Sequence, residues 1–184
     1  MATTAPSEPT PPSEPMIRTE PHIYVELTYS PLDTAATIAR AKSPEAGAVV
    51  LFLGTTRNTF ASLPVLGLTY QSYVPLALST LLSIARSILS THSLTSISIT
   101  HRLGEVPIGE ESIAIAVSAP HRQAAWRGGE EALEMTKERA EIWKLERFDG
   151  GEGVWRANRD GVMGVRVGEG DDREKRRGSY HLQD

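Results

Sequence analysis

The sequence predicts an α+β fold with a mixed or antiparallel sheet. Some segments alternate apolar and polar residues, as half-buried strands do, and others repeat apolar residues at helical spacing. These two kinds of segment intermingle along the chain. Two strand-like segments also flank a short loop rich in glycine and proline at 103–109, which is typical of a hairpin.

The first part of the chain is expected to fold into two strands around a short helix. Residues 22–28 alternate in polarity and predict a strand. A turn signal follows at 30–33, and 34–41 is expected to be a helix that stops before Pro44. Residues 47–54 form a continuous apolar run between two glycines, which indicates a buried strand.

The middle of the chain changes from strand to helix. Residues 65–73 alternate again, which predicts a strand with Leu66, Leu68 and Tyr70 on one face. Pro75 suits the first turn of a helix. That helix carries a core-facing stripe made of Leu78, Leu81, Leu82, Ala85, Ile88 and Leu89.

Two further strands and a long helix are expected in the second half. The strands are 94–101 and 112–118, and the helix runs from about 121 to about 140. Gly128 and Gly129 lie inside that helix, where each costs about 1 kcal/mol relative to alanine. Either a kink or a close backbone contact explains them.

His101 and Arg102 end the first of these two strands. We interpret this pair as structural, with Glu105 and Glu110 of the following loop as possible partners of its charges.

Length and composition indicate one globular domain. The 184 residues are 40% hydrophobic and 23% charged, as in ordinary soluble proteins. Residues 1–20, rich in Pro, Ser, Thr and Glu, are expected to be disordered, and 161–184 to be a flexible charged tail around a domain at 21–160. The chain shows neither a secretory signal nor an apolar run as long as a membrane span, so we expect a cytoplasmic protein.

The charge balance and the absence of cysteine exclude several functions. A net charge of −4 and a pI near 5.8 argue against general nucleic-acid binding. Without cysteine, the chain has no disulfide, no thiolate metal site and no thiol nucleophile of its own. We expect no metal ion and no cofactor in this chain. Any sulfur chemistry requires sulfur carried by another molecule.

Cationic residues gather around the predicted helix at 121–140. His121 and Arg122 stand at its start, where free backbone N–H groups and the helix dipole favour an anion. Lys137 and Lys144 follow, and Arg57 lies in a polar loop after the buried strand at 47–54. The cluster suits a phosphate or a carboxylate. The alternative is a solvated helix face with Glu–Lys pairs and an ordinary surface loop.

Taken in order, three segments resemble one family: GAVVLFLGTTRN, HRLGEVPIGEESIAIAVSAPHR, and Lys137 and Lys144 with six residues between them, the second lysine lying within WKLE. The family is the large, catalytic subunit of molybdopterin synthase, and the resemblance covers about 23–159. It implies a hammerhead-like α/β arrangement with a smaller β subdomain. It also implies an enzyme, a sulfurtransferase of molybdenum cofactor biosynthesis, that converts cyclic pyranopterin monophosphate into molybdopterin by forming a dithiolene.

The resemblance further implies partners. Sulfur comes from a small ubiquitin-like subunit whose C-terminal glycine carries a thiocarboxylate, and two large subunits form the centre of a heterotetramer. The matched positions implied to bind substrate are Arg57, His121, Arg122, Lys137, Lys144, Leu145, Glu146 and Arg159. Two positions depart from the family pattern: Glu141 stands where relatives often have proline, and Gly128–Gly129 is richer in glycine than expected.

From the chemistry of these groups we assign Lys137 to the anionic tail of the sulfur carrier and Lys144 to acid/base catalysis on the substrate. Glu146 then orients a lysine or a substrate hydroxyl. Two other functions remain open. A non-catalytic module would bind the tail of a ubiquitin-like protein without converting a pterin. A generic phosphate-ligand enzyme would need no such partner, although the chain lacks a nucleotide-type phosphate loop.

Overall fold

A computed structural model describes residues 16–60, 63–148, 153–157 and 165–166 of the chain, with side chains in the first two ranges. The described part is an α+β fold with two sheets, as predicted. The helices are α1 (Thr34–Ala41), α2 (Val74–Thr91) and α3 (Arg122–Arg139). The strands are β1 (Ile17–Glu20), β2 (Ile23–Thr28), β3 (Ala48–Thr55), β4 (Thr59–Phe60), β5 (Leu63–Ser72), β6 (Ser96–Arg102), β7 (Gly104–Val106), β8 (Glu111–Ala119), β9 (Ile142–Phe148), β10 (Gly153–Ala157) and β11 (Val165–Arg166).

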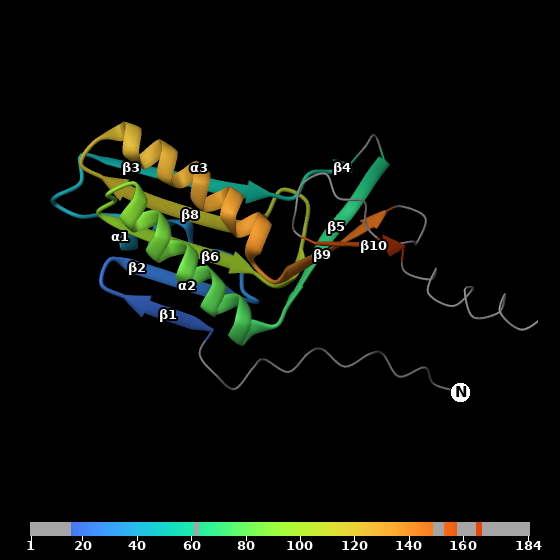
Figure 1. The fold of residues 1–184 in the computed structure, drawn as a ribbon. Helices are drawn as coiled ribbons and strands as arrows, with labels where there is room; N and C mark the ends of the chain where they lie inside the picture. Colours follow the sequence, from blue (N-terminus) through green and yellow to red (C-terminus); the bar gives the residue numbers. More distant parts are fainter. Residues whose placement is uncertain (1–15, 61–62, 149–152, 158–164, 167–184) are drawn as a thin grey trace, which may run out of the picture.

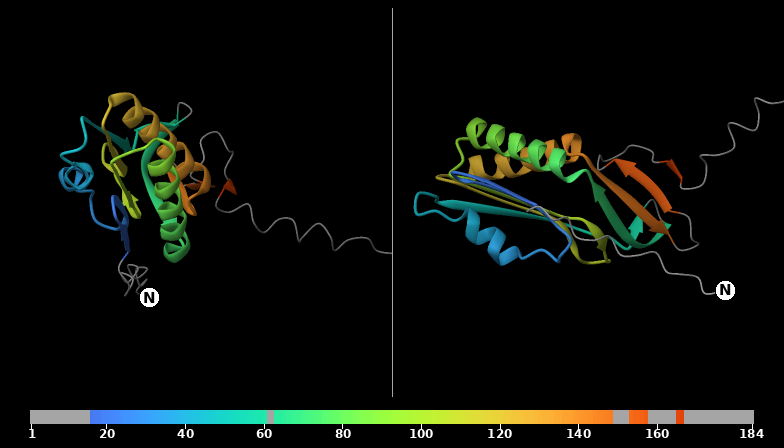
Figure 2. Two further views of the ribbon diagram at one scale, coloured as in Figure 1. Left: turned by 60° about the vertical axis from the view of Figure 1, so that its left-hand side comes forward. Right: turned by 90° about the horizontal axis from the view of Figure 1, so that it is seen from below.

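The first sheet has five strands in the order β1-β2-β6-β8-β3. It is mixed, because β2 and β6 run parallel while the other neighbours are antiparallel. Figure 1 shows α2 and α3 side by side over one face of this sheet, and Figure 2 shows α1 on the opposite face. β3 is an edge strand, so one side of its backbone pairs with no other strand of the described part.

The main core lies between this sheet and the helix pair α2 and α3. On α2 the predicted stripe is buried at Leu78, Leu81, Ala85 and Ile88. It packs with the core of the first sheet through one hydrophobic cluster. By length and composition alone, α2 is the one helix of the described residues that is long and apolar enough to cross a membrane. A core helix passes the same test, and here the apolar stripe faces the sheet.

The two glycines inside α3 allow the helix to approach its neighbours closely. A Cβ on Gly128 would lie 3.0 Å from the Leu94 side chain, and one on Gly129 would lie 3.4 Å from Val117 and 3.5 Å from Val50. α3 is continuous from Arg122 to Arg139. Of the two explanations that the sequence left open, the close backbone contact is therefore the one that the structure supports.

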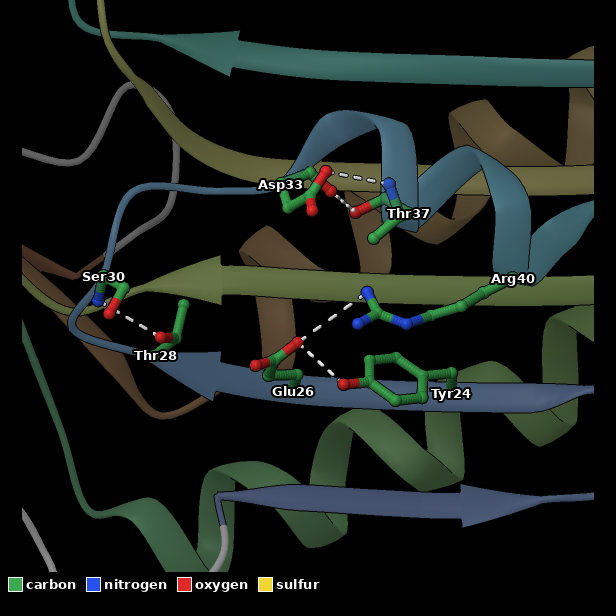
Figure 3. A network of polar contacts seen from close by, with 8 residues as sticks. Tyr24, Glu26, Thr28, Ser30, Asp33, Thr37 and Arg40 are labelled. Atoms are coloured by element: carbon green, nitrogen blue, oxygen red, sulfur yellow. Dashed lines mark hydrogen bonds and ion pairs between the residues drawn. The ribbon is translucent and has the colours of Figure 1, made fainter.

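The opposite face of the sheet is more polar, and α1 packs there through the contacts in Figure 3. The Asp33 carboxylate accepts a hydrogen bond of 2.9 Å from the Ala36 N–H and so caps α1. The Arg40 guanidinium lies 4.0 Å from the centroid of the Tyr24 ring, and the Tyr24 hydroxyl donates to Glu26 over 2.8 Å. Burial and the Glu26 carboxylate raise the pKa of Tyr24 to about 12.

The second sheet extends from one end of the first and is the smaller β subdomain that the resemblance implied (Figures 1 and 2). At its centre β5 pairs antiparallel with β9 on one side and with β7 on the other. β7 lies in the segment that we expected to be a loop. Only Leu103 separates β6 of the first sheet from β7 of the second, and Gly104 then adopts a positive φ of 74°.

The structure corrects two expectations about the ends of the domain. Residues 17–20, expected to be disordered, form β1 and pair with β2. Val165–Arg166, expected in the flexible tail, form β11 and pair with β10. The predicted disorder of 1–15 and the rest of the predicted tail lie outside the described residues.

The expected face of the strand at 65–73 was also wrong at one position. A register shift between Val65 and Gly67 interrupts the alternation of β5. Leu66 is consequently 57% exposed, and Val65 is buried instead.

Candidate functional site

A cavity of about 290 Å³ lies where the first sheet meets the second. The end of β3, the start of β8 and the last turns of α3 form one side of it, and β4, β5 and β9 form the other. The lining residues are Phe52, Gly54, Thr55, Arg57, Thr59, Phe60, Val65, Leu68, Tyr70, His101, Ser112, Ile113, Leu133, Lys137, Lys144 and Glu146. Apolar and polar side chains share its wall.

Three of the predicted cationic residues line this cavity together. Arg57 follows the end of β3, Lys137 lies in the last turn of α3, and Lys144 lies in β9. The C-terminal end of a helix dipole favours a cation such as Lys137. Apolar neighbours reduce the solvent screening of these charges, which strengthens their attraction for an anion. The cavity is thus suited to bind and orient an anionic group.

Glu146 contributes a buried carboxylate beside these cations. In β9, side chains alternate between the two faces of the strand, so Lys144 and Glu146 share the face towards the cavity. The Lys144 Nζ lies 3.7 Å from the Glu146 Oε1. Leu145 lies between them in the sequence and is not among the cavity-lining residues, because its side chain leaves the other face of the strand.

His121 and Arg122 lie at the other end of α3. They line a separate, shallow hollow with Gly47, Pro120 and Trp126. A helix of 18 residues is roughly 27 Å long, which separates them from Lys137 and the cavity. His121 is the N-cap residue of α3, but its side chain makes no capping hydrogen bond and is exposed. Within one chain, therefore, the predicted single cationic hollow is divided into two.

The His101–Arg102 pair was interpreted as structural, and the structure separates its two members. Arg102 is structural as expected, since its Nη1 donates to the Glu110 Oε2 over 2.5 Å. Glu105, the other suggested partner, instead pairs with Arg147 at 2.8 Å. His101 lines the cavity and was missed as a site residue.

Tyr70 is a second lining residue that the sequence did not single out as functional. Its ring contacts the His101 ring with a centroid separation of 4.9 Å and an interplanar angle of 74°. Both residues are buried on the side of the sheets that faces the cavity. The only sequence signal for them was their place on an apolar strand face, which is shared by most core residues. Arg159, the remaining candidate, lies outside the described residues.

The comparisons with known proteins show the family of this chain. The sequence model of the MoaE protein family matches residues 27–139. The chain belongs to the MoaE family. It is 68% identical over 145 residues to the molybdopterin synthase catalytic subunit of Pyrenophora tritici-repentis, which covers 79% of this chain and 81% of that protein. It is 64% identical over 148 residues to the subunit of the same name from Neurospora crassa, covering 80% and 72% of the two chains.

Solved MoaE-like structures show the same fold. Molybdopterin synthase from Staphylococcus aureus aligns with a TM-score of 0.68 and 34% identity, covering 71% of this chain and 94% of that one. A protein–protein complex of subunits 1 and 2 of molybdopterin-converting factor from Helicobacter pylori aligns with a TM-score of 0.57 and 24% identity, covering 66% and 83%. The resemblance stated from the sequence is thereby confirmed, and so is the role of a catalytic subunit in molybdopterin synthesis.

Proposed function

We propose that the cavity is the place where this MoaE-family chain carries out molybdopterin synthase chemistry. In it, two sulfur atoms, each carried by the C-terminal thiocarboxylate of a small ubiquitin-like subunit, pass in successive transfers to cyclic pyranopterin monophosphate and form the dithiolene, and each spent carrier is left with a C-terminal carboxylate. The observation that carries the proposal is the convergence of Arg57, Lys137 and Lys144 on one partly apolar cavity with the buried Glu146. These cations match the two anions of the reaction, the thiocarboxylate and the substrate phosphate.

The sulfur carrier is a separate protein in this proposal. The chain has no cysteine, so it supplies no thiol of its own. The Helicobacter pylori relative was solved as a complex of two subunits of molybdopterin-converting factor, which supports a small-subunit partner here. The extended tail of that subunit would enter the cavity with its terminal group facing the lysines. We place the complex in the cytoplasm.

The two lysines take different roles. Lys137, in the last turn of α3, pairs with the anionic terminus of the carrier and stabilises the charge that develops when sulfur leaves. Lys144 faces the substrate and transfers protons, while Glu146, 3.7 Å away, orients it. Arg57, in the exposed loop after β3, contributes a guanidinium that is suited to bind phosphate in a bidentate manner.

The residues His121 and Arg122 join the site from a second copy of the chain. β3 is an edge strand that begins beside Gly47, in the hollow of His121, and ends at Thr55, in the cavity. If two β3 edges meet antiparallel about a two-fold axis, the start of one lies against the end of the other. The partner's His121 and Arg122 would then approach this chain's Arg57.

Apolar surface along that edge supports the pairing. Val49 on β3 is 39% exposed and Trp126 on α3 is 64% exposed. A further hollow beside them is lined by Val50, Leu51, Phe52 and Leu133 together with Trp126. Two large subunits paired here, each with its own small subunit, give the heterotetramer.

Reconstitution with purified components tests the function. The full-length chain, thiocarboxylated small subunit and cyclic pyranopterin monophosphate are mixed, and the dithiolene product is measured. We expect Lys137→Ala and Lys144→Ala each to lower turnover at least about 100-fold, since each removes a charge that acts in the transition state. Lys42→Ala, at the exposed C-cap of α1, is the matched control and should keep full turnover.

The same assay separates this function from the alternative of a non-catalytic binding module. Binding of the small subunit without any conversion of the pterin by the wild-type chain would favour the binding module. Near-normal turnover in both lysine variants would refute the roles given to the lysines.

A further inference from the structure

His101, the last residue but one of β6, carries an imidazole whose protonation pattern is fixed by the backbone. The side chain is 1% exposed, and its Nδ1 lies 2.8 Å from the carbonyl oxygen of Arg102. A carbonyl oxygen only accepts hydrogen bonds, so Nδ1 carries a proton and donates it. In the neutral ring, Nε2 therefore carries no proton and holds a lone pair. Nε2 lies on the edge of the ring that faces away from the hydrogen bond to Arg102.

The imidazole also stays neutral. Burial lowers the pKa of His101 to about 4, well below the ordinary value of 6.5, and the hydrogen bond to the Arg102 carbonyl opposes this only in part. Around neutral pH the ring therefore adds no charge to a cavity that already holds Arg57, Lys137 and Lys144. Its contacts are those of a fixed, uncharged ring.

One of those contacts leads directly to the lysine that faces the substrate. The His101 ring meets the Tyr70 ring nearly at right angles, with centroids 4.9 Å apart. Tyr70 of β5 is the register partner of Lys144 of β9, and both side chains line the cavity. Directly paired residues on one face of an antiparallel sheet have Cβ atoms about 5 Å apart, so the Tyr70 ring limits where the lysine side chain can lie.

We propose that His101 is a positioning residue of the sulfur-transfer site: anchored to the Arg102 carbonyl, it fixes the Tyr70 ring, and the ring holds Lys144 in line with Glu146 and the substrate. The proposal rests on the proposed function, because it assigns a role within the same reaction. A merely structural core histidine would stabilise the fold but would leave the chemical step unaffected.

A double-mutant cycle on the reconstituted reaction tests this role. His101→Asn retains an N–H close to Nδ1 for the Arg102 carbonyl and removes the ring, whereas Tyr70→Leu removes the ring that His101 contacts. We expect each variant to lower kcat about tenfold with KM changed less than about twofold. Because both act through the same contact, the double variant should be no slower than either single variant. Tyr70→Phe keeps the ring and should retain most of the activity.

Ile99→Val is the matched control for stability, since Ile99 is fully buried on the same face of β6 but does not line the cavity. It should lower the free energy of unfolding without lowering kcat. Two outcomes would overturn the proposal: losses of His101→Asn and Tyr70→Leu that multiply in the double variant, or a kcat of His101→Asn equal to that of Ile99→Val.

A second measurement does not depend on activity. In the full-length chain labelled with ¹⁵N, NMR correlations within the imidazole show which ring nitrogen carries the proton. We expect His101 to be protonated at Nδ1 only at pH 7. A proton on Nε2 would overturn the proposal even with normal turnover. If the wild-type chain converted no pterin, this spectrum would still separate failure of the proposed function from failure of the His101 geometry.

Discussion

At the scale of single residues, His101 and Arg102 show how one strand end serves two purposes. Consecutive side chains of a strand leave opposite faces, so the two cannot share an environment. Arg102 closes the loop after β7 through Glu110, and His101 turns into the cavity. Two adjacent polar residues thus hold a loop and line a site at the same time.

The buried His101 should make the protein less stable in mild acid. Its pKa is about 4 in the folded chain and near 6.5 when exposed, so between these values the unfolded state binds the extra proton. The contribution of the neutral, buried His101 to the free energy of unfolding is therefore fully present above about pH 6.5 and is lost as the pH falls towards 4. From pH 7 to pH 5 the free energy of unfolding should fall by about 2 kcal/mol on this account.

Urea unfolding of the wild-type chain and of His101→Asn at both pH values measures this effect. The other titrating groups are common to the two proteins, so the difference between their pH dependences isolates the histidine. Equal pH dependences would contradict the prediction.

The sequence predicted the charged residues of the cavity better than its neutral ones. Arg57, Lys137, Lys144 and Glu146 were all predicted, because their order along the chain resembles the family pattern and cations are conspicuous beside apolar runs. Tyr70 stood on a strand face that read as ordinary core. The role that we propose for it depends on β5 lying between β7 and β9, a pairing of distant segments that local periodicity does not encode.

At the scale of elements, local signals placed the helices well and the short strands poorly. The helix at 34–41 has the predicted bounds, because Asp33 caps its start and the lysine at position 42 ends it in an extended conformation. β7 has only three residues, too few to show a period, and the register shift in β5 moved Leu66 to the outside. Pairing with neighbours decided both features.

The two glycines of α3 should respond differently to alanine. Helical propensity favours alanine by about 1 kcal/mol at either position. At Gly129 the nearest atoms, 3.4 Å and 3.5 Å from the new Cβ, are at ordinary contact distance, so Gly129→Ala should raise the free energy of unfolding by up to about 1 kcal/mol. At Gly128 the Leu94 side chain is 3.0 Å away and must move, so Gly128→Ala should gain less.

Chemical denaturation of the two variants beside the wild-type chain checks this order. A larger gain at Gly128 than at Gly129 would show that Leu94 yields easily and that the close approach of α3 has some other cause.

At the scale of the whole molecule, the predicted cations lie at two ends of α3, and the proposed dimer would bring them together in one site. One chain carries Lys137 in the cavity and His121 roughly 24 Å away along the axis of α3. In the proposed dimer each site takes Arg57, Lys137 and Lys144 from one chain and His121 and Arg122 from the other. In that dimer, the cations of a single chain would therefore make up only part of each site.

Mixing two inactive variants should restore activity. A dimer of one Lys144→Ala chain and one chain carrying His121→Ala and Arg122→Ala contains one site with every group in place. After the subunits exchange at random, turnover should recover to roughly a quarter of the wild-type value. Each variant alone is the control. No recovery, with exchange verified by mass spectrometry of differently tagged chains, would show that each chain works with its own residues only.

The single residue between β6 and β7 has a consequence for the size of the cavity. A longer connection would allow the second sheet to change its angle to the first. Here only Leu103 separates the two strands, and Gly104 follows it with a left-handed backbone conformation, so the connection permits little change of that angle. This short connection therefore helps to fix the angle between the two sheets and, with it, the width of the cavity between them. A cavity of this design could be enlarged for a bulkier substrate only by smaller lining side chains, because a connection of one residue cannot lengthen to move the sheets apart.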